Sequence, residues 1–532
     1  MWKSSSSIVF LLLCAVVPWQ MPVAAQVLTA QMDNSRRGAN VHETVLTPAN
    51  VNSDHFGKLY SRTVDGDIFA QPLYARSLNI RGVGKRNVVF VATEHDSVYA
   101  FDASGASDAP LWKTSFIGTP RGISTVAAQD VHCPFIIPEV GITSTPVIDP
   151  SSRTIYVLAR TNENGKYVQR LHALDISSGQ EKPNSPVVIE ALVKGTGKGS
   201  VDGKVSFDPL RENPRSALLL TGGQIYLTWG SSCDVGPYHG WIMAYDAHTL
   251  KQTAVINTSP DGGEGGIWQS DAGPAADDDG NVFVVTGNGD FNAAGPGGRD
   301  YGDSVLKLHL EKSGLAVRDY FTPFNQKLLD SKDWDLGSQG PLLLPKQQGN
   351  HAHLLVVAGK EGKLYVLDRD RLGRYRDASD SQIVQSIKLP AGYGAVAYWN
   401  GHIFYADCCG FVTHDFVMKN GLLKAGPVTG RMSSLGGIPS VSADGAANGI
   451  LWVVSTKEWN EFLNDKPAVL HAYEAANIAH ELYNSEQVAG RDRAGMTVRF
   501  ATPTIADGHV FVGARRQLDV YGLLRREKQN PK

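Results

Sequence analysis

The chain has 532 residues, and its 55 glycines make up about a tenth of the total, above the usual ~7 %. Charged residues account for only 19 % and hydrophobic residues for 42 %, a composition that excludes intrinsic disorder and a coiled coil. The 50 basic and 53 acidic residues leave a formal net charge of −3 without any basic block, which argues against a nucleic acid or an anionic membrane surface as a partner.

The first residues have the pattern of an export signal. Lys3 supplies a positive start, residues 8–17 form a short apolar stretch, and Val23-Ala24-Ala25 is a small-residue cleavage site. The apolar run is too short for a membrane anchor, which needs about 20 residues. A lipid anchor at Cys14 is a less favoured alternative, because the bulky Leu13 precedes it. We expect residues 1–25 to be a signal peptide and the mature protein to be periplasmic or secreted, without stable membrane insertion.

Four of the five cysteines remain after removal of the signal. An even number of cysteines in an oxidising compartment permits disulfides. The favoured pairing joins Cys133 to Cys233, with a second bridge between the adjacent Cys408 and Cys409; four free thiols are the alternative. The chain contains no Cys-x-x-Cys-His motif, so a covalently attached haem is excluded.

One pattern recurs along the chain: a Pro with apolar neighbours, a turn, an aromatic-rich strand, and then a strand that ends in Ala-aromatic-Asp or a variant. Asp-Gly at Asp279-Gly280, Asp444-Gly445 and Asp507-Gly508 is typical of tight hairpins, because glycine accepts a positive φ. Counting the first strands of these units gives eight, which begin near Val88, Thr154, Gln224, Asn281, Leu354, His402, Ile450 and His509.

Sheets built from such units are apolar on both faces and cannot bury themselves alone, so they should stack radially into a closed ring. The last unit ends after too few strands, and residues 59–63 are expected to supply the missing outer strand. The sequence predicts an all-β protein: an eight-bladed β-propeller of four-stranded blades over residues 58–524. An N-terminal extension (26–57), whose first fifteen or so residues are expected to be mobile, precedes it, and a charged, mobile tail (525–532) follows.

The eight units and their strand endings resemble the propeller of pyrroloquinoline-quinone (PQQ) alcohol dehydrogenases of the methanol dehydrogenase type, without a haem domain. The opening stretch 47–59 (T-P-A-N-V-N-S-D-H-F-G-K-L) is similar to that family as well. The resemblance implies PQQ and Ca²⁺ as cofactors, an alcohol or sugar hydroxyl as substrate, and a separate cytochrome as electron acceptor.

Two residues resemble the ligands of the calcium ion in that family. Asp234, in W-G-S-S-C-D-V-G-P-Y-H-G-W, lies near the position where the family has a metal-binding Glu; a turn-capping Asp is the alternative. Asn288, in T-G-N-G-D-F-N, matches an Asn whose amide oxygen coordinates Ca²⁺, a hard cation that prefers oxygen donors. A simple turn is its alternative.

Three further residues resemble the residues that contact the quinone and the substrate. Trp268, in G-G-I-W-Q-S, matches an indole beneath the planar quinone, with blade packing as its alternative. Asp335, at the end of T-P-F-N-Q-K-L-L-D-S-K-D-W-D, matches the catalytic base, which also lies beside the metal and accepts the hydroxyl proton; a turn closing a blade is its alternative. Lys360, in G-K-E-G-K-L-Y-V-L-D-R, matches a cation that stabilises negative charge on the quinone oxygens, with a solvated hairpin Lys as its alternative.

Three departures from the family pattern affect the metal, the disulfide and the anchoring of the cofactor. Gly337 stands where lanthanide-using relatives carry a second Asp, which points to Ca²⁺. The region that in many relatives holds adjacent cysteines followed by an Arg for a cofactor carboxylate contains the single Cys133 and no Arg. PQQ carries three carboxylates, whose burial without partners would be costly. The second hypothesis is therefore a non-catalytic propeller, a binding or assembly scaffold whose cofactor site has decayed.

Overall fold

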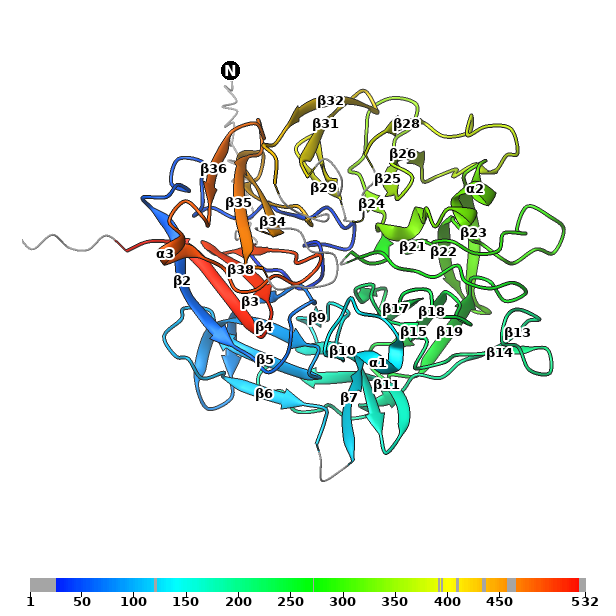
Figure 1. Ribbon diagram of the computed structural model, residues 1–532, viewed down its shortest axis with the longest axis horizontal. Coiled ribbons are helices and arrows are strands. Elements are labelled where there is room, and N and C mark those ends of the chain that lie inside the picture. Colours follow the sequence, from blue (N-terminus) through cyan, green and yellow to red (C-terminus); the bar gives the residue numbers. More distant parts are fainter. Residues whose placement is uncertain are drawn as a thin grey trace, which may run out of the picture.

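The computed structural model describes residues 25–118, 122–270, 272–390, 393, 396–407, 411–432, 437–456 and 466–525. The predicted signal peptide, apart from Ala25, the predicted Cys408–Cys409 bridge and the tail beyond Arg525 lie outside these residues. Within them, eight antiparallel sheets are arranged in chain order around a central axis (Figure 1). The protein is an eight-bladed β-propeller, as the repeat predicts.

Each blade has four strands, numbered from the axis outward. The first four blades are β3 (Leu73–Ile80), β4 (Gly84–Thr93), β5 (Ser97–Asp102) and β6 (Trp112–Ser115); β9 (Val147–Asp149), β10 (Thr154–Glu163), β11 (Lys166–Asp175) and β12 (Val187–Val188); β16 (Leu219–Thr221), β17 (Gln224–Ser231), β18 (Trp241–Asp246) and β19 (Gln252–Asn257); and β20 (Ala275–Ala276), β21 (Asn281–Val285), β22 (Val305–Glu311) and β23 (Gly314–Thr322). The other four are β24 (Leu342–Leu343), β25 (Leu354–Gly359), β26 (Lys363–Asp368) and β28 (Gln385–Lys388); β29 (Val396–Trp399), β30 (His402–Ala406), β31 (Thr413–Lys419) and β32 (Leu422–Val428); β33 (Ser440–Asp444), β34 (Ala447–Thr456), β35 (Ala468–Glu474) and β36 (Glu481–Asn484); and β37 (Thr504–Ala506), β38 (His509–Ala514), β39 (Gln517–Leu523) and β2 (Phe56–Thr63).

The remaining elements are short. The strands are β1 (Ala39–Asn40), β7 (Ile123–Ala127), β8 (Glu139–Val140), β13 (Leu192–Lys194), β14 (Lys204–Ser206), β15 (Glu212–Asn213) and β27 (Arg374–Tyr375), and the helices are α1 (Ala128–Val131), α2 (Gln326–Ser331), the 3₁₀ turn η2 (Leu336–Ser338) and α3 (Ala489–Asp492). In the described part of the chain, no helix has the length and apolar character needed to cross a membrane.

The repeated Asp at the end of the third strand has a local physical role. The Asp175 carboxylate accepts the Ser177 N–H at 2.8 Å, and Asp246 accepts the Thr249 N–H at 2.7 Å. Such a side chain caps the turn that leads to the outer strand. At the same end of the blades, Gly280 and Gly508 have a φ of +78°, which the tight turn between the first two strands requires.

The ring closes by pairing the two ends of the propeller. Strand β2, from the start of the chain, pairs antiparallel with β39, with Arg62 opposite Leu518, and completes the eighth blade. The predicted closure by residues 59–63 is therefore confirmed. Figure 1 shows the blue β2 beside the red strands of the last blade.

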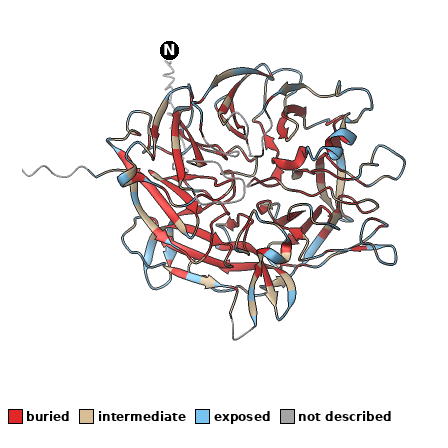
Figure 2. Cartoon of the chain, viewed as in Figure 1, coloured by how far each residue is buried: buried red, intermediate tan, exposed pale blue. Residues whose placement is uncertain are grey.

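The core lies between neighbouring blades. Every residue of β25 is buried, and Val356 of this strand packs in one apolar cluster with Ile403 of the next blade. Figure 2 shows buried residues concentrated toward the axis and exposed residues at the periphery. A sheet apolar on both faces gains this burial only by stacking, which is why the blades form a ring.

The predicted mobility of the first residues of the N-terminal extension is wrong. Residues 27–43, which we call the basal strap, cross the ring and hydrogen-bond to all eight blades in turn. The blade partners, from first to eighth, are Tyr74, Ile148, Leu220, Ala276, Leu343, Tyr398, Val441 and Ile505. Most of these bonds join main-chain atoms, so the strap has no apolar pattern that the sequence could reveal.

Arg36 is the centre of the strap and is 1 % exposed. Its guanidinium donates to the carbonyls of Pro274 (2.9 Å), Ala30 (2.8 Å) and Leu218 (3.1 Å) and to the Thr29 hydroxyl (2.9 Å). A buried cation is tolerated when its donors are satisfied in this way. The strap thereby ties blades 3 and 4 together across the axis.

Candidate active site

A cavity of about 510 Å³ lies at the end of the channel opposite the strap. Its lining residues precede the innermost strands, whereas the strap bonds to residues within those strands: Trp268 lines the cavity ahead of β20, and the strap contacts Ala276 in β20. The same holds for Phe500 and Ile505 around β37. The loops of most blades therefore meet at this mouth, where propellers commonly bind ligands.

Asp335, Asn288 and Lys360, which are far apart in the chain, are in direct contact here. The backbone N–H of Asn288 donates to Asp335 Oδ1 at 2.8 Å, and Lys360 Nζ lies 2.5 Å from Asp335 Oδ2. The Lys360 N–H also donates to the Asp335 carbonyl at 2.9 Å. Both carboxylate oxygens of Asp335, whose side chain is 6 % exposed, are thus held in place.

Lys360 is shared by two carboxylates. Its Nζ also lies 3.0 Å from Asp333 Oδ1, which in turn accepts the side-chain N–H of Asn288 at 2.8 Å. Burial alone would lower the pKa of Lys360, but the carboxylates of Asp335 and Asp333 outweigh burial and raise it above its usual value. Lys360 is therefore a fixed cation beside Asp335.

The side chains of Asp335 and Trp268 both pack closely against the backbone of Gly287. A Cβ atom on Gly287 would overlap Asp335 Oδ1 and lie 2.9 Å from Trp268 Cδ1. A Cβ atom on Gly337 would lie 2.5 Å from the carbonyl carbon of Thr286 and 2.7 Å from the nitrogen of Gly287. Only glycine permits this packing of η2 on the strand that leads to Asn288.

Behind Asp335 lies Asp303, which the sequence analysis did not single out. It is fully buried, and its Oδ1 accepts the Leu336 N–H at 3.0 Å, which anchors the start of η2. Burial, followed by the charge of Asp335, raises the pKa of Asp303 well above its usual value. In the sequence, Asp303 belongs to a Gly-Asp pair that follows the Asn288 loop. Only the fold shows that it lies behind Asp335.

Trp268 and Asp234 lie on the same cavity wall and are linked through Tyr238. The Tyr238 hydroxyl donates to Asp234 Oδ1 at 2.9 Å, and its ring meets Trp268 edge-on, with centroids 6.3 Å apart. Asp234 opens onto the cavity yet is surrounded by protein: burial, and then the Asp335 carboxylate, raise its pKa to about 6. The structure thus gathers all five candidate residues at one mouth.

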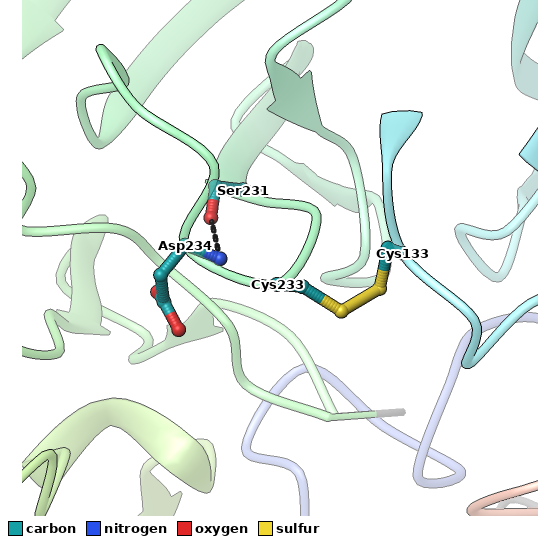
Figure 3. Close-up of a disulfide and its surroundings, with 4 residues drawn as sticks. All are labelled: Cys133, Ser231, Cys233 and Asp234. Atoms are coloured by element: carbon teal, nitrogen blue, oxygen red, sulfur yellow. Dashed lines mark hydrogen bonds between the residues drawn. A yellow bond between two sulfur atoms is a disulfide. The ribbon is translucent and has the colours of Figure 1, made fainter. Parts of the chain in front are cut away.

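The predicted disulfide between Cys133 and Cys233 is confirmed, and it borders the cavity. It joins the region between blades 1 and 2 to the loop after β17. Figure 3 shows Asp234 directly after Cys233, with its carboxylate pointing away from the sulfur atoms and its N–H bonded to the Ser231 hydroxyl at 3.0 Å. Cys233 and Asp234 both have a positive φ, of 53° and 54°. Asp234 thus directly follows a disulfide-bonded residue and has an uncommon backbone conformation.

Several buried polar atoms at this mouth have no hydrogen-bond partner among the described residues. They are Asn288 Oδ1, Trp268 Nε1, Asn213 Oδ1 and Ser338 Oγ. Native proteins rarely leave such groups unsatisfied, so their grouping points to a polar ligand. The orientation of the Asn288 amide is set by its N–H bond to Asp333, which turns the free oxygen away from that carboxylate.

Two arginines that the sequence analysis did not consider also line the cavity. Arg215 follows β15 and stacks on the Phe500 ring at 4.6 Å, and Arg499 stacks on the Phe135 ring at 4.1 Å. No local motif marks either residue, since they come from blades 3 and 8.

The donor set fits a hard cation that shares its coordination with a ligand. Among the described residues, no three His, Cys, Asp or Glu side chains are grouped closely enough to hold a metal by themselves. The free oxygen of Asn288 and the carboxylates of Asp234 and Asp335 are oxygen donors of the kind Ca²⁺ prefers. A further donor from a bound cofactor would complete such a site.

Comparisons with known proteins match this chain at the level of the fold. The structure is similar to a quinohemoprotein alcohol dehydrogenase of Pseudomonas putida HK5 (TM-score 0.62, 14 % identity, 96 % of this chain and 82 % of that one). It is also similar to the quinohemoprotein alcohol dehydrogenase of Comamonas testosteroni (0.59, 13 %, 96 % and 82 %) and to a europium-containing methanol dehydrogenase (0.60, 12 %, 95 % and 99 %). No protein-family model and no curated protein matches the sequence. The chain has the propeller fold of quinoprotein alcohol dehydrogenases.

Proposed function

We propose that this protein is an exported quinoprotein oxidoreductase that oxidises an alcohol or sugar hydroxyl with PQQ and Ca²⁺. The observation that carries the proposal is the contact of Asp335 with Lys360 and Asn288 beside the Trp268 indole, with the Asn288 oxygen buried and unpartnered. A propeller that had lost its cofactor site would gain no stability from two carboxylates, a cation and an unpartnered buried oxygen grouped at one mouth.

In such a reaction, each of these side chains would have a separate role. A quinone bound on the Trp268 face would supply the two-electron acceptor. Asp335 would accept the hydroxyl proton, and the bonds to both of its oxygens orient it for this purpose. Lys360 would stabilise negative charge that develops beside it. The surrounding aromatic wall, which includes Phe135 and Phe411, would exclude water.

The geometry around Gly337 supports Ca²⁺ over a lanthanide. A second carboxylate at this position would need a Cβ atom 2.5 Å from the backbone of Thr286, which the packing of η2 excludes. The metal would instead be held by Asn288 Oδ1, Asp234 and Asp335, a set suited to a divalent hard cation.

Electrons would leave to a separate acceptor such as a cytochrome, because the sequence has no haem-attachment motif. The sequence features of an export signal support a periplasmic or secreted site of action.

Reconstitution tests the proposal. Purified protein is incubated with PQQ and Ca²⁺ and assayed against a panel of alcohols and sugars with an artificial electron acceptor. We expect turnover of at least one hydroxyl substrate that depends on both additions and is abolished by a calcium chelator. If the protein binds PQQ by fluorescence titration but turns over none of the panel, the binding-scaffold hypothesis replaces the enzyme.

A further inference from the structure

Asp333 lies two residues before Asp335 and lines the same cavity, but it is not among the five candidate residues. We propose that Asp333 is a positioning residue for the metal site: it holds the Asn288 amide so that the oxygen, and not the nitrogen, is presented to the cation. This inference rests on the proposed function and adds to it the residue that sets the orientation of a metal ligand.

The side chain of Asn288 has two ends of nearly the same shape and opposite chemistry. The oxygen can coordinate a hard cation, whereas the nitrogen carries only donors. Among the described residues, the amide of Asn288 makes one hydrogen bond, from Nδ2 to Asp333 Oδ1 at 2.8 Å, and its Oδ1 has no partner. An ionised carboxylate is an acceptor only, so it binds the nitrogen end and repels the oxygen end. Asp333 therefore selects one of the two orientations.

Asp333 is itself held in place from two sides. Its φ of +55° lies in the left-handed region, which Asp adopts more readily than most residues, and its N–H donates to the Asp330 carbonyl at the end of α2. Its Oδ1 lies 3.0 Å from Lys360 Nζ, which also contacts Asp335. The carboxylate thus has a defined position, although the side chain is 66 % exposed.

The ion pair with Lys360 alone would give Asp333 little importance, because exposed ion pairs contribute little to stability. The bond to Asn288 is different, since Asn288 is only 7 % exposed and its own N–H donates to Asp335. Both the main chain and the side chain of Asn288 are therefore tied to the segment 333–335. Loss of a residue that orients a metal ligand typically lowers metal affinity about 10- to 100-fold.

The test measures the Kd for Ca²⁺ by isothermal titration of PQQ-saturated protein. Asp333→Ala removes the acceptor and should raise this Kd about 10-fold. Asp333→Asn is the matched control: it loses the charge but keeps an oxygen that can accept from Asn288 and Lys360, so its Kd should stay within about 3-fold of wild type. Equal losses in the two variants would assign the effect to charge and overturn the inference.

A second background separates orientation from a general structural effect. In Asn288→Asp both ends of the side chain are oxygens, so no partner is needed to choose between them. Adding Asp333→Ala to this background should not weaken Ca²⁺ binding, and a loss of about 10-fold there would overturn the inference. A wild-type Kd in the single variant Asp333→Ala would also overturn it and leave the proposed function intact. Wild-type protein that binds PQQ but no Ca²⁺ would overturn both.

Discussion

The two ends of the propeller channel hold their buried charged side chains in different ways. At the base, the guanidinium of Arg36 donates four hydrogen bonds to the strap and to blades 3 and 4. At the mouth, Asp335 and Asp333 share the cation Lys360, the Asp234 carboxylate lies near them, and Asn288 Oδ1 lacks a described partner. The buried cation at the base is therefore satisfied within the protein, whereas the carboxylates and the amide oxygen at the mouth are arranged so that a ligand could interact with them.

This contrast predicts that substitutions at the two ends have different effects on ligand binding and on stability. Changes of the polar side chains at the mouth should alter binding and turnover at nearly constant stability, and changes at the base should do the reverse. Loss of the disulfide that borders the mouth is expected to affect both stability and binding. Four predictions test that separation, in order of decreasing expected effect.

The largest effect is expected for Asp335→Asn. The amide keeps the shape of the side chain but cannot accept the hydroxyl proton, so kcat should fall about 10³-fold, within the range of a general base. PQQ affinity and the thermal midpoint should change little. Steady-state kinetics and a fluorescence titration check this, and unchanged turnover would remove Asp335 from its role.

Cys133→Ser should lower the free energy of unfolding by about 4 kcal/mol, because the disulfide closes a loop with a sequence separation of 100 residues. It should also weaken Ca²⁺ binding, since Cys233 directly precedes Asp234. Urea unfolding with and without a reductant measures the first effect. A variant as stable as the oxidised wild type would contradict the prediction.

Arg36→Met should destabilise the protein by about 3 kcal/mol, because it leaves three buried carbonyls without donors. PQQ affinity measured well below the unfolding transition should not change. A selective loss of PQQ binding in this variant would show that the base and the mouth are energetically coupled, and would contradict their independence.

The smallest effect is expected for Asn288→Ala, which removes the free oxygen but keeps the backbone N–H that orients Asp335. Ca²⁺ affinity, measured by isothermal titration in the presence of PQQ, should fall about 10-fold. Asn40→Ala at the base is the matched control: it removes the side-chain hydrogen bonds to the Ile505 carbonyl and from the His42 N–H and should cost about 1 kcal/mol of stability without affecting calcium. Equal calcium affinities for the two variants would exclude Asn288 as a ligand.

Much of the architecture could be read from local patterns. The turn-capping Asp at the end of several third strands and the Asp-Gly hairpins act within a few residues, so they mark the blades directly in the sequence. The basal strap could not be read in this way, because its bonds to the blades are mostly made by main-chain atoms and its polar side chains resemble those of a loop. The positions of Arg215 and Arg499 could not be predicted for a related reason: the rings on which they stack, Phe500 and Phe135, are hundreds of residues away in the chain.

The sequence by itself determined the number of blades, the strand that closes the ring and the residue types at the candidate site, because these follow from short-range turn chemistry and from sheets that are apolar on both faces. Only the tertiary structure decided which charges meet. Loop ends from separate blades come together at the axis, and their distances depend on how all the blades stack. The contact of Lys360 with two carboxylates, the stacked arginines and the orphaned Asn288 oxygen exist only once the ring has closed.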